Sequence, residues 1–159
     1  MTFSNLPAAP FCYWATSKVL SVFRLFPNFE SQTRIVRCGM GTLDDFRFLR
    51  CWWEVEPRSL SSSREMTCQG HGFVPYAKGG SASPFWAPIP LVVNYANDGC
   101  EVKAFVEQKV GSASRKIQSQ NLYFRAGLCF GRRTRRLSPA CLPAGSIFSD
   151  GSNAVFLLK

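Results

Sequence analysis

The sequence predicts an α+β fold in a single domain of 159 residues, with an N-terminal helix, a loop-rich middle and a C-terminal antiparallel β-meander. Three observations support this prediction. Hydrophobic residues make up 46% of the chain and aromatic residues 14%, which is enough to bury a core. The 12 glycines and 10 prolines are spread along the chain, so the elements should be short. Helical spacing of hydrophobic residues is clearest near the N-terminus, and strand-like alternation is clearest in the C-terminal half.

The first element is predicted to be a helix over residues 11–26. Four hydrophobic residues recur at positions i, i+3, i+4 and i+7 and would share one face of that helix: Val19, Val22, Phe23 and Phe26. Pro27 would end the helix, because proline cannot continue its hydrogen-bonding pattern. We expect the hydrophobic face to pack against the core.

A short strand is predicted next, over residues 33–38, followed by a turn at residues 39–41. Residues 43–55 fit two patterns. Their aromatic spacing, with two aspartates suited to a first turn, favours a helix, whereas the alternation of the same residues suits a strand equally well. Pro57 closes the segment in either case, so both interpretations stay open.

Residues 58–90 are predicted to be a flexible, loop-rich insertion within the single domain of residues 1–159. Clusters of serine, glycine and proline at this density are typical of loops, and so long a loop is uncommon inside a compact domain. The few aromatic residues of the segment would attach it to the core.

The C-terminal half is predicted to be an antiparallel meander. Residues 91–95 are rich in β-forming residues, and residues 96–99 contain asparagine, aspartate and glycine, which tolerate a positive φ in a turn. Residues 100–107 then alternate between hydrophobic and charged side chains, which completes a predicted β-hairpin. Further strands are expected over residues 120–130 and 154–158.

The net charge of +9 is concentrated in one place. Residues 115–136, named here the basic segment, contain seven arginines and lysines and no acidic residue. A local positive patch of this kind attracts a polyanion. The predicted nucleic-acid-binding residues are the cations of the segment and one tyrosine: Arg115, Lys116, Tyr123, Arg125, Arg132, Arg133, Arg135 and Arg136.

The composition of the basic segment predicts how it would bind. Arginine suits phosphate, because its planar guanidinium donates two parallel hydrogen bonds. Tyr123 and Phe124 lie beside Arg125 and would stack on exposed bases, as in the binding of single-stranded RNA. RNA is therefore the expected partner, ahead of DNA. Residues 131–136 (GRRTRR) also fit a short nuclear import signal, which would add an import receptor as partner.

The seven cysteines are odd in number and irregularly spaced, which is typical of reduced thiols and not of a secreted disulfide framework. Cys68 and His71 have the spacing of a pair of metal ligands, and Cys38 and Cys51 would complete a set of four for zinc. No known zinc-finger spacing matches this set. No cofactor is therefore expected, and zinc is kept as an alternative. Because His71 is the only histidine and no catalytic motif is present, no enzymatic activity is expected.

Taken together, these features predict a small basic accessory protein that binds RNA, or another nucleic acid, non-specifically. In size and charge it resembles movement proteins and silencing suppressors of plant RNA viruses, with no shared motif. Two alternatives remain open: an orphan reading-frame product without a selected function, and a zinc-stabilised protein-interaction module. No stretch is apolar enough to span a membrane, so we expect the protein in the cytoplasm, the nucleus or both.

Overall fold

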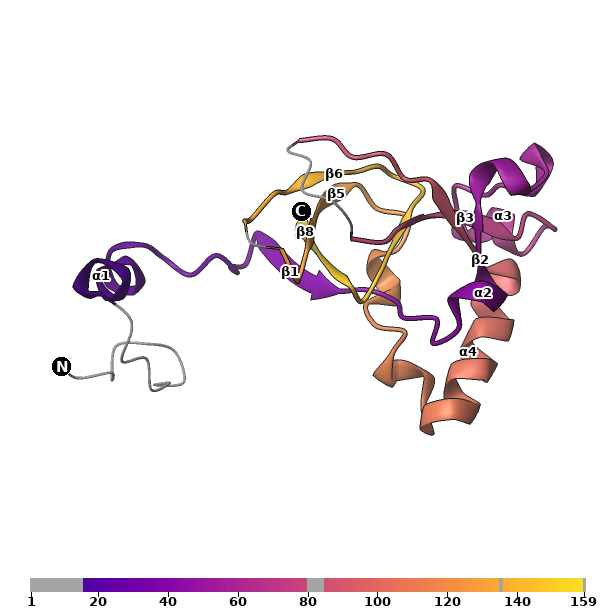
Figure 1. The fold of residues 1–159 in the computed structure, drawn as a ribbon, viewed down its shortest axis with the longest axis horizontal. Helices are drawn as coiled ribbons and strands as arrows, with labels where there is room; N and C mark the ends of the chain where they lie inside the picture. Colours follow the sequence, from indigo (N-terminus) through magenta and orange to yellow (C-terminus); the bar gives the residue numbers. More distant parts are fainter. Residues whose placement is uncertain (1–15, 80–84, 135, 159) are drawn as a thin grey trace.

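The computed structural model describes residues 16–79, 85–134 and 136–158 and contains two four-stranded sheets with helices around them (Figure 1). The strands of the first sheet, in spatial order, are β1 (Arg34–Cys38), β8 (Ser152–Leu157), β5 (Gly127–Gly131) and β6 (Ala140–Leu142). Those of the second sheet are β2 (Leu49–Cys51), β4 (Leu91–Asn94), β3 (Phe73–Ala77) and β7 (Ile147–Phe148). All neighbours pair antiparallel except β3 and β7, which are parallel.

Helical elements connect and flank the sheets. The α-helices are α1 (Ser17–Leu25), α2 (Asp45–Phe48), α3 (Arg64–Thr67) and α4 (Ala96–Val110). Short 3-10 turns are η2 (Trp52–Glu54), η3 (Pro57–Ser59), η4 (Ala113–Arg115) and η5 (Gln120–Leu122). The α+β class, with an N-terminal helix and C-terminal strands, is confirmed. In the described part of the chain, no helix is both long and apolar enough to cross a membrane.

Met40 couples the two sheets. It follows β1 of the first sheet, and its backbone N–H donates to the carbonyl of Phe148 in the second sheet at 2.9 Å. Its own carbonyl accepts the Tyr76 hydroxyl at 2.5 Å and the Asp150 backbone N–H at 2.9 Å. Met40 is fully buried, so these hydrogen bonds are shielded from water.

Large side chains from both sheets and from α4 form one core. The Phe148 ring lies at its centre, 5.8 Å from the Tyr123 ring and 5.3 Å from the Phe156 ring, measured between centroids. Val102 and Val106 of α4 are also completely buried in this core. Aromatic pairs at these separations add to the free energy gained by burying their area.

Helix α1 lies within the predicted range of residues 11–26, of which residues 11–15 are outside the described part. Thr16 caps its N-terminus through a hydrogen bond from the Val19 backbone N–H. The expectation that its hydrophobic face packs on the core is wrong, because α1 has no buried residue and Phe23 is 52% exposed. Figure 1 shows the reason: α1 lies away from both sheets, at the end of an extended segment.

The predicted hairpin is correct up to its turn and wrong after it. Asn97, Asp98 and Gly99 have positive φ angles of 51°, 55° and 72°, as the turn prediction required. Residues 100–107, predicted as a strand, are helical and belong to α4. Glutamate, lysine and alanine in this stretch favour a helix. Val102 and Val106 also have the i, i+4 spacing of one helical face. Residues four apart share a face in a strand as well as in a helix, so the alternation did not distinguish the two.

Other predicted elements are refined by the structure. Residues 43–55 contain both of the open alternatives, since α2 is followed directly by β2. Within residues 58–90, β3 pairs with both β4 and β7, so this part of the expected insertion belongs to the second sheet. The strands predicted over 33–38 and 154–158 correspond to β1 and β8. The strand expected over 120–130 is shorter, because η5 occupies its beginning and β5 starts at Gly127.

Candidate nucleic-acid interface

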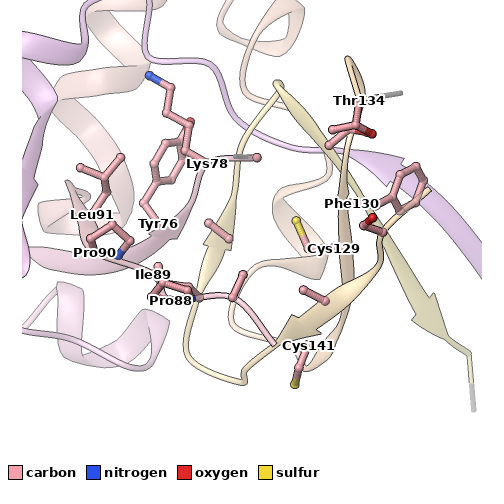
Figure 2. Close-up of a pocket in the computed structure, with 16 residues that line it drawn as sticks. Tyr76, Lys78, Pro88, Ile89, Pro90, Leu91, Cys129, Phe130, Thr134 and Cys141 are labelled. Atoms are coloured by element: carbon pink, nitrogen blue, oxygen red, sulfur yellow. The ribbon is translucent and has the colours of Figure 1, made fainter. Parts of the chain in front are cut away.

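A cavity of about 300 Å³ opens between the two sheets (Figure 2). The second sheet contributes the end of β3, at Tyr76, and the following Lys78. The first sheet contributes β5 and β6, including Cys129 and Cys141. Residues 87–91, which lead into β4, form another part of the wall. Segments distant in sequence therefore meet at this cavity, and its position depends on how the sheets pack.

Residues 87–91 give the cavity a stiff apolar wall. Pro88 and Pro90 restrict the backbone, because the proline ring holds φ near −65°. Ile89 and Leu91 add half-buried hydrophobic side chains to the lining. The Pro90 carbonyl accepts a hydrogen bond from the Trp52 backbone N–H at 2.9 Å, which holds the segment beside η2.

The arginine-rich end of the basic segment forms part of the opposite wall. We name residues 131–136 the arginine loop; Arg135 lies outside the described residues. Gly131 and Thr134 of this loop line the cavity. The Thr134 hydroxyl lies 3.3 Å from the carbonyl oxygen of Gly131 and 2.8 Å from that of Arg136, and it can donate its hydrogen to either. Arg132, Arg133 and Arg136 are exposed.

Ion pairs neutralise several cations elsewhere in the structure but few in the basic segment. The cations paired with a carboxylate outside the segment are Arg37, Arg47, Arg64, Lys78 and Lys103. Among the segment's described cations, only Lys116 has such a partner, with its Nζ 3.4 Å from Asp150 Oδ2. The positive charges of Arg132, Arg133 and Arg136 are thus left without a carboxylate among the described residues, in the form that a phosphate would neutralise.

The fold brings some of the predicted residues together and separates others. Lys116 and Arg132 meet at Asp150, whose backbone carbonyl accepts a hydrogen bond from Arg132 Nη1 at 3.2 Å. Arg125 lies at the opposite end of β5 and donates to the Leu157 carbonyl at 3.2 Å. Five strand residues separate the two groups, or about 17 Å at the rise of an antiparallel strand. Arg115 hydrogen-bonds the Val110 carbonyl that ends α4.

Tyr123 is placed in the core and not on this surface. Its ring is 3% exposed, and its hydroxyl donates to the Gln118 carbonyl at 2.7 Å. Burial raises the pKa of the Tyr123 hydroxyl well above its usual value. The neighbouring Phe124 is half-buried and contacts the Tyr95 ring edge-on. The aromatic stacking surface expected from the sequence is therefore absent at these two residues, because a strand-like pattern does not show which face is buried.

The four residues considered for zinc are not grouped into a site. Cys38 ends β1, Cys51 ends β2, and Cys68 and His71 follow α3. Nδ1 of His71 lies 2.5 Å from the Arg58 carbonyl, so this nitrogen is already engaged. Across the described ranges, no three histidine, cysteine or carboxylate side chains are arranged to hold a metal ion.

The residues that line the cavity were not predicted as site residues from the sequence. Lys78, Ser138 and the prolines of residues 87–91 lie in segments without periodicity, where the density of glycine and proline was the only signal. Lys78 pairs with Asp45 beside the cavity. Burial alone would raise the pKa of Asp45, but hydrogen bonds from Lys78 and Thr42 outweigh it and hold that pKa below its usual value.

The fold and this surface define an α+β protein with an exposed arginine loop beside a cavity, and comparison with known proteins adds a chemical context. No family model matches the chain. It is 29% identical over 156 residues to the adenine-specific methyltransferase BrxX of Escherichia coli O9:H4 (strain HS), covering 97% of this chain. It is also 29% identical over 122 residues to the adenine-specific methyltransferase PglX of Lacticaseibacillus casei (strain Zhang), covering 75% of this chain. The chain spans only 12% and 10% of the lengths of these two proteins.

These similarities correct the functional predictions made from the sequence. Both relatives are bacterial and are named as methyltransferases, so the expectation of a non-enzymatic accessory protein of the viral RNA-binding type is wrong. Nothing supports silencing suppression, a nuclear import signal or an import receptor. A match along 97% of the chain is also contrary to an orphan reading frame. The functional prediction failed because net charge indicates what kind of partner a protein attracts but does not indicate which reaction it catalyses.

Proposed function

We propose that this chain is a DNA-contacting part of an adenine-specific methyltransferase, and that the arginine loop holds the phosphate backbone. The observation that carries the proposal is the loop's exposed, unneutralised positive charge in a chain similar to two such methyltransferases. An enzyme that methylates adenine within a nucleic acid must bind the polymer that contains it. Phosphate contacts supply much of that affinity and position the protein on the duplex.

The burial of the aromatic rings within the basic segment supports a duplex over a single strand. Proteins that bind single strands stack successive bases on exposed aromatic rings. Tyr123 and Phe124, which precede Arg125, are buried and half-buried, and Phe130, which precedes the arginine loop, is half-buried. The cations that remain exposed suit a backbone of regularly spaced phosphates. Groups at the two ends of β5, Arg125 and Arg132, would contact phosphates separated by more than one nucleotide.

Replacing Arg132, Arg133 and Arg136 together with alanine should weaken binding to a 20-base-pair DNA duplex and reduce its dependence on salt. Each phosphate that the protein no longer neutralises should reduce the slope of log K against log salt by about 0.9. Three such phosphates, one for each arginine, would therefore reduce it by about 2.7. Fluorescence anisotropy of a labelled duplex, titrated at several salt concentrations, measures both quantities.

A matched control removes the same charge elsewhere. Alanine at Lys18, Arg24 and Arg37 also lowers the net charge by three, but these residues lie in α1 and β1. This control should keep the wild-type slope. If the two triple variants behave alike, the loop has no special role and only net charge matters. If the wild-type chain does not bind the duplex at low salt, or prefers a single-stranded RNA of the same length, the proposal is wrong.

A further inference from the structure

We infer that the cavity between the two sheets binds one unpaired base of DNA whose backbone is held by the arginine loop. This inference rests on the proposed function and adds to it a second kind of contact. The site combines the apolar wall of residues 87–91, the β5–β6 wall and the arginine loop at the edge. Figure 2 shows these three parts arranged around the same opening.

The size and lining of the cavity suit a single heterocycle. Its volume of about 300 Å³ is at the lower end of the range for small-ligand pockets. Much smaller apolar cavities, of about 150 Å³, admit a benzene ring. Prolines and aliphatic side chains provide apolar surface on one side, and the opposite wall combines the small Ala140 with Cys129, Phe130 and Cys141. A base would fit this space with room for its attachment to the sugar.

The distribution of charge matches a nucleotide. Lys78 of the lining is paired with Asp45 beside the cavity, and burial raises the pKa of the Cys129 thiol, which keeps it neutral. At the edge, Arg133 and Arg136 flank Thr134 and have no carboxylate partner among the described residues. A neutral interior beside a cationic edge is complementary to an uncharged base joined to an anionic phosphate.

One polar group in the lining remains available to the base. The hydroxyl of Thr134 is already engaged by two carbonyls, whereas the half-buried Ser138 forms no hydrogen bond through its side chain with any described residue. A serine hydroxyl can both donate and accept, so it can bind the edge of a base. A pocket that binds a base in this way combines apolar contact with a few hydrogen bonds.

The test compares duplexes that differ in one nucleotide. Extruding a paired base costs a few kcal/mol, and this cost is least for a base without a partner. A duplex with a single bulged adenine should therefore bind about tenfold more tightly than the fully paired duplex. A bulged abasic nucleotide bends the duplex without offering a base and should bind like the paired one. Equal affinity for the bulged-adenine and abasic duplexes would overturn the inference.

Cavity-filling variants locate the effect. Phenylalanine at Ala87 and, separately, at Ala140 fills the cavity from opposite walls, and phenylalanine at the exposed Ser114 is the matched control. Circular dichroism melting identifies the filled variants that keep the wild-type fold. Ala87 lies outside the strands, so its variant should do so. A folded filled variant should bind paired duplex normally and lose the preference for the bulged adenine, while the Ser114 variant keeps it.

The outcomes separate this inference from the proposed function. A preference that persists in a folded filled variant overturns the cavity as the base site, even if duplex binding through the arginine loop stands. Absence of binding to every duplex, paired or bulged, contradicts the proposed function itself. Unchanged fluorescence of a bulged 2-aminopurine on duplex binding would also contradict the inference, because a base that leaves the stacked duplex for the proline and aliphatic lining of the cavity is no longer quenched by its neighbouring bases.

Discussion

Replacing Phe148 with alanine should lower the free energy of unfolding by about 3–5 kcal/mol. The side chain is fully buried and lies between the rings of Tyr123 and Phe156. Its removal forfeits the transfer free energy of the ring and leaves a cavity that rigid neighbours cannot fill. Because β7 belongs to the second sheet and Phe156 to the first, the replacement weakens the packing between the sheets.

Chemical denaturation followed by circular dichroism measures this change. The matched control is Phe46→Ala in α2, since the Phe46 side chain is 95% exposed. That variant should differ from wild type by less than about 0.5 kcal/mol. If the two alanine variants are destabilised to a similar extent, Phe148 does not occupy the core position that the structure assigns to it.

Replacing Gly39 with alanine should destabilise the fold by about 3 kcal/mol, at the upper end of the usual cost of overpacking. An added Cβ would lie 2.7 Å from Cδ2 of Phe148 and closer still to the Phe148 carbonyl oxygen. That oxygen accepts the Met40 backbone N–H, so β1 or β7 would have to move and stretch this hydrogen bond. The glycine is thus required by close packing of two backbones.

Gly151→Ala is the control for this prediction. An added Cβ at Gly151 would approach only Ser149 Oγ, at 3.4 Å, which is an ordinary contact. Thermal and chemical denaturation should therefore show a change of less than about 1 kcal/mol for Gly151→Ala. A Gly39→Ala variant as stable as this control would show that the backbones of Gly39 and Phe148 are not in close contact.

Both replacements bear on the candidate interface. The cavity has walls from both sheets, and Phe148, Gly39 and Met40 lie where the sheets are joined. A variant that remains folded but loosens this junction should lose the preference for a bulged adenine before it loses affinity for paired duplex. Phosphate contacts from the exposed arginine loop depend less on the separation of the sheets than a base enclosed between them does.

Features that depend on neighbouring residues were predictable from the sequence. Hydrophobic periodicity identified α1, short runs of β-forming residues identified β1 and β8, and the tolerance of asparagine, aspartate and glycine for positive φ identified the turn at the start of α4. The basic segment was also evident, because a run of arginines without acidic residues is visible in any fold. These local preferences act over a few residues and need no information about distant contacts.

Features that depend on distant partners became visible in the folded chain. Residues 100–107 suit a strand or a helix, and burial of Val102 and Val106 against the core selects the helix. Packing against Phe148 places Tyr123 inside, whereas the equally hydrophobic face of α1 finds no partner in the described chain. The cavity exists only where two sheets meet. Its walls come from residues 76–79, 87–91 and 129–141, so no local pattern could have shown them together.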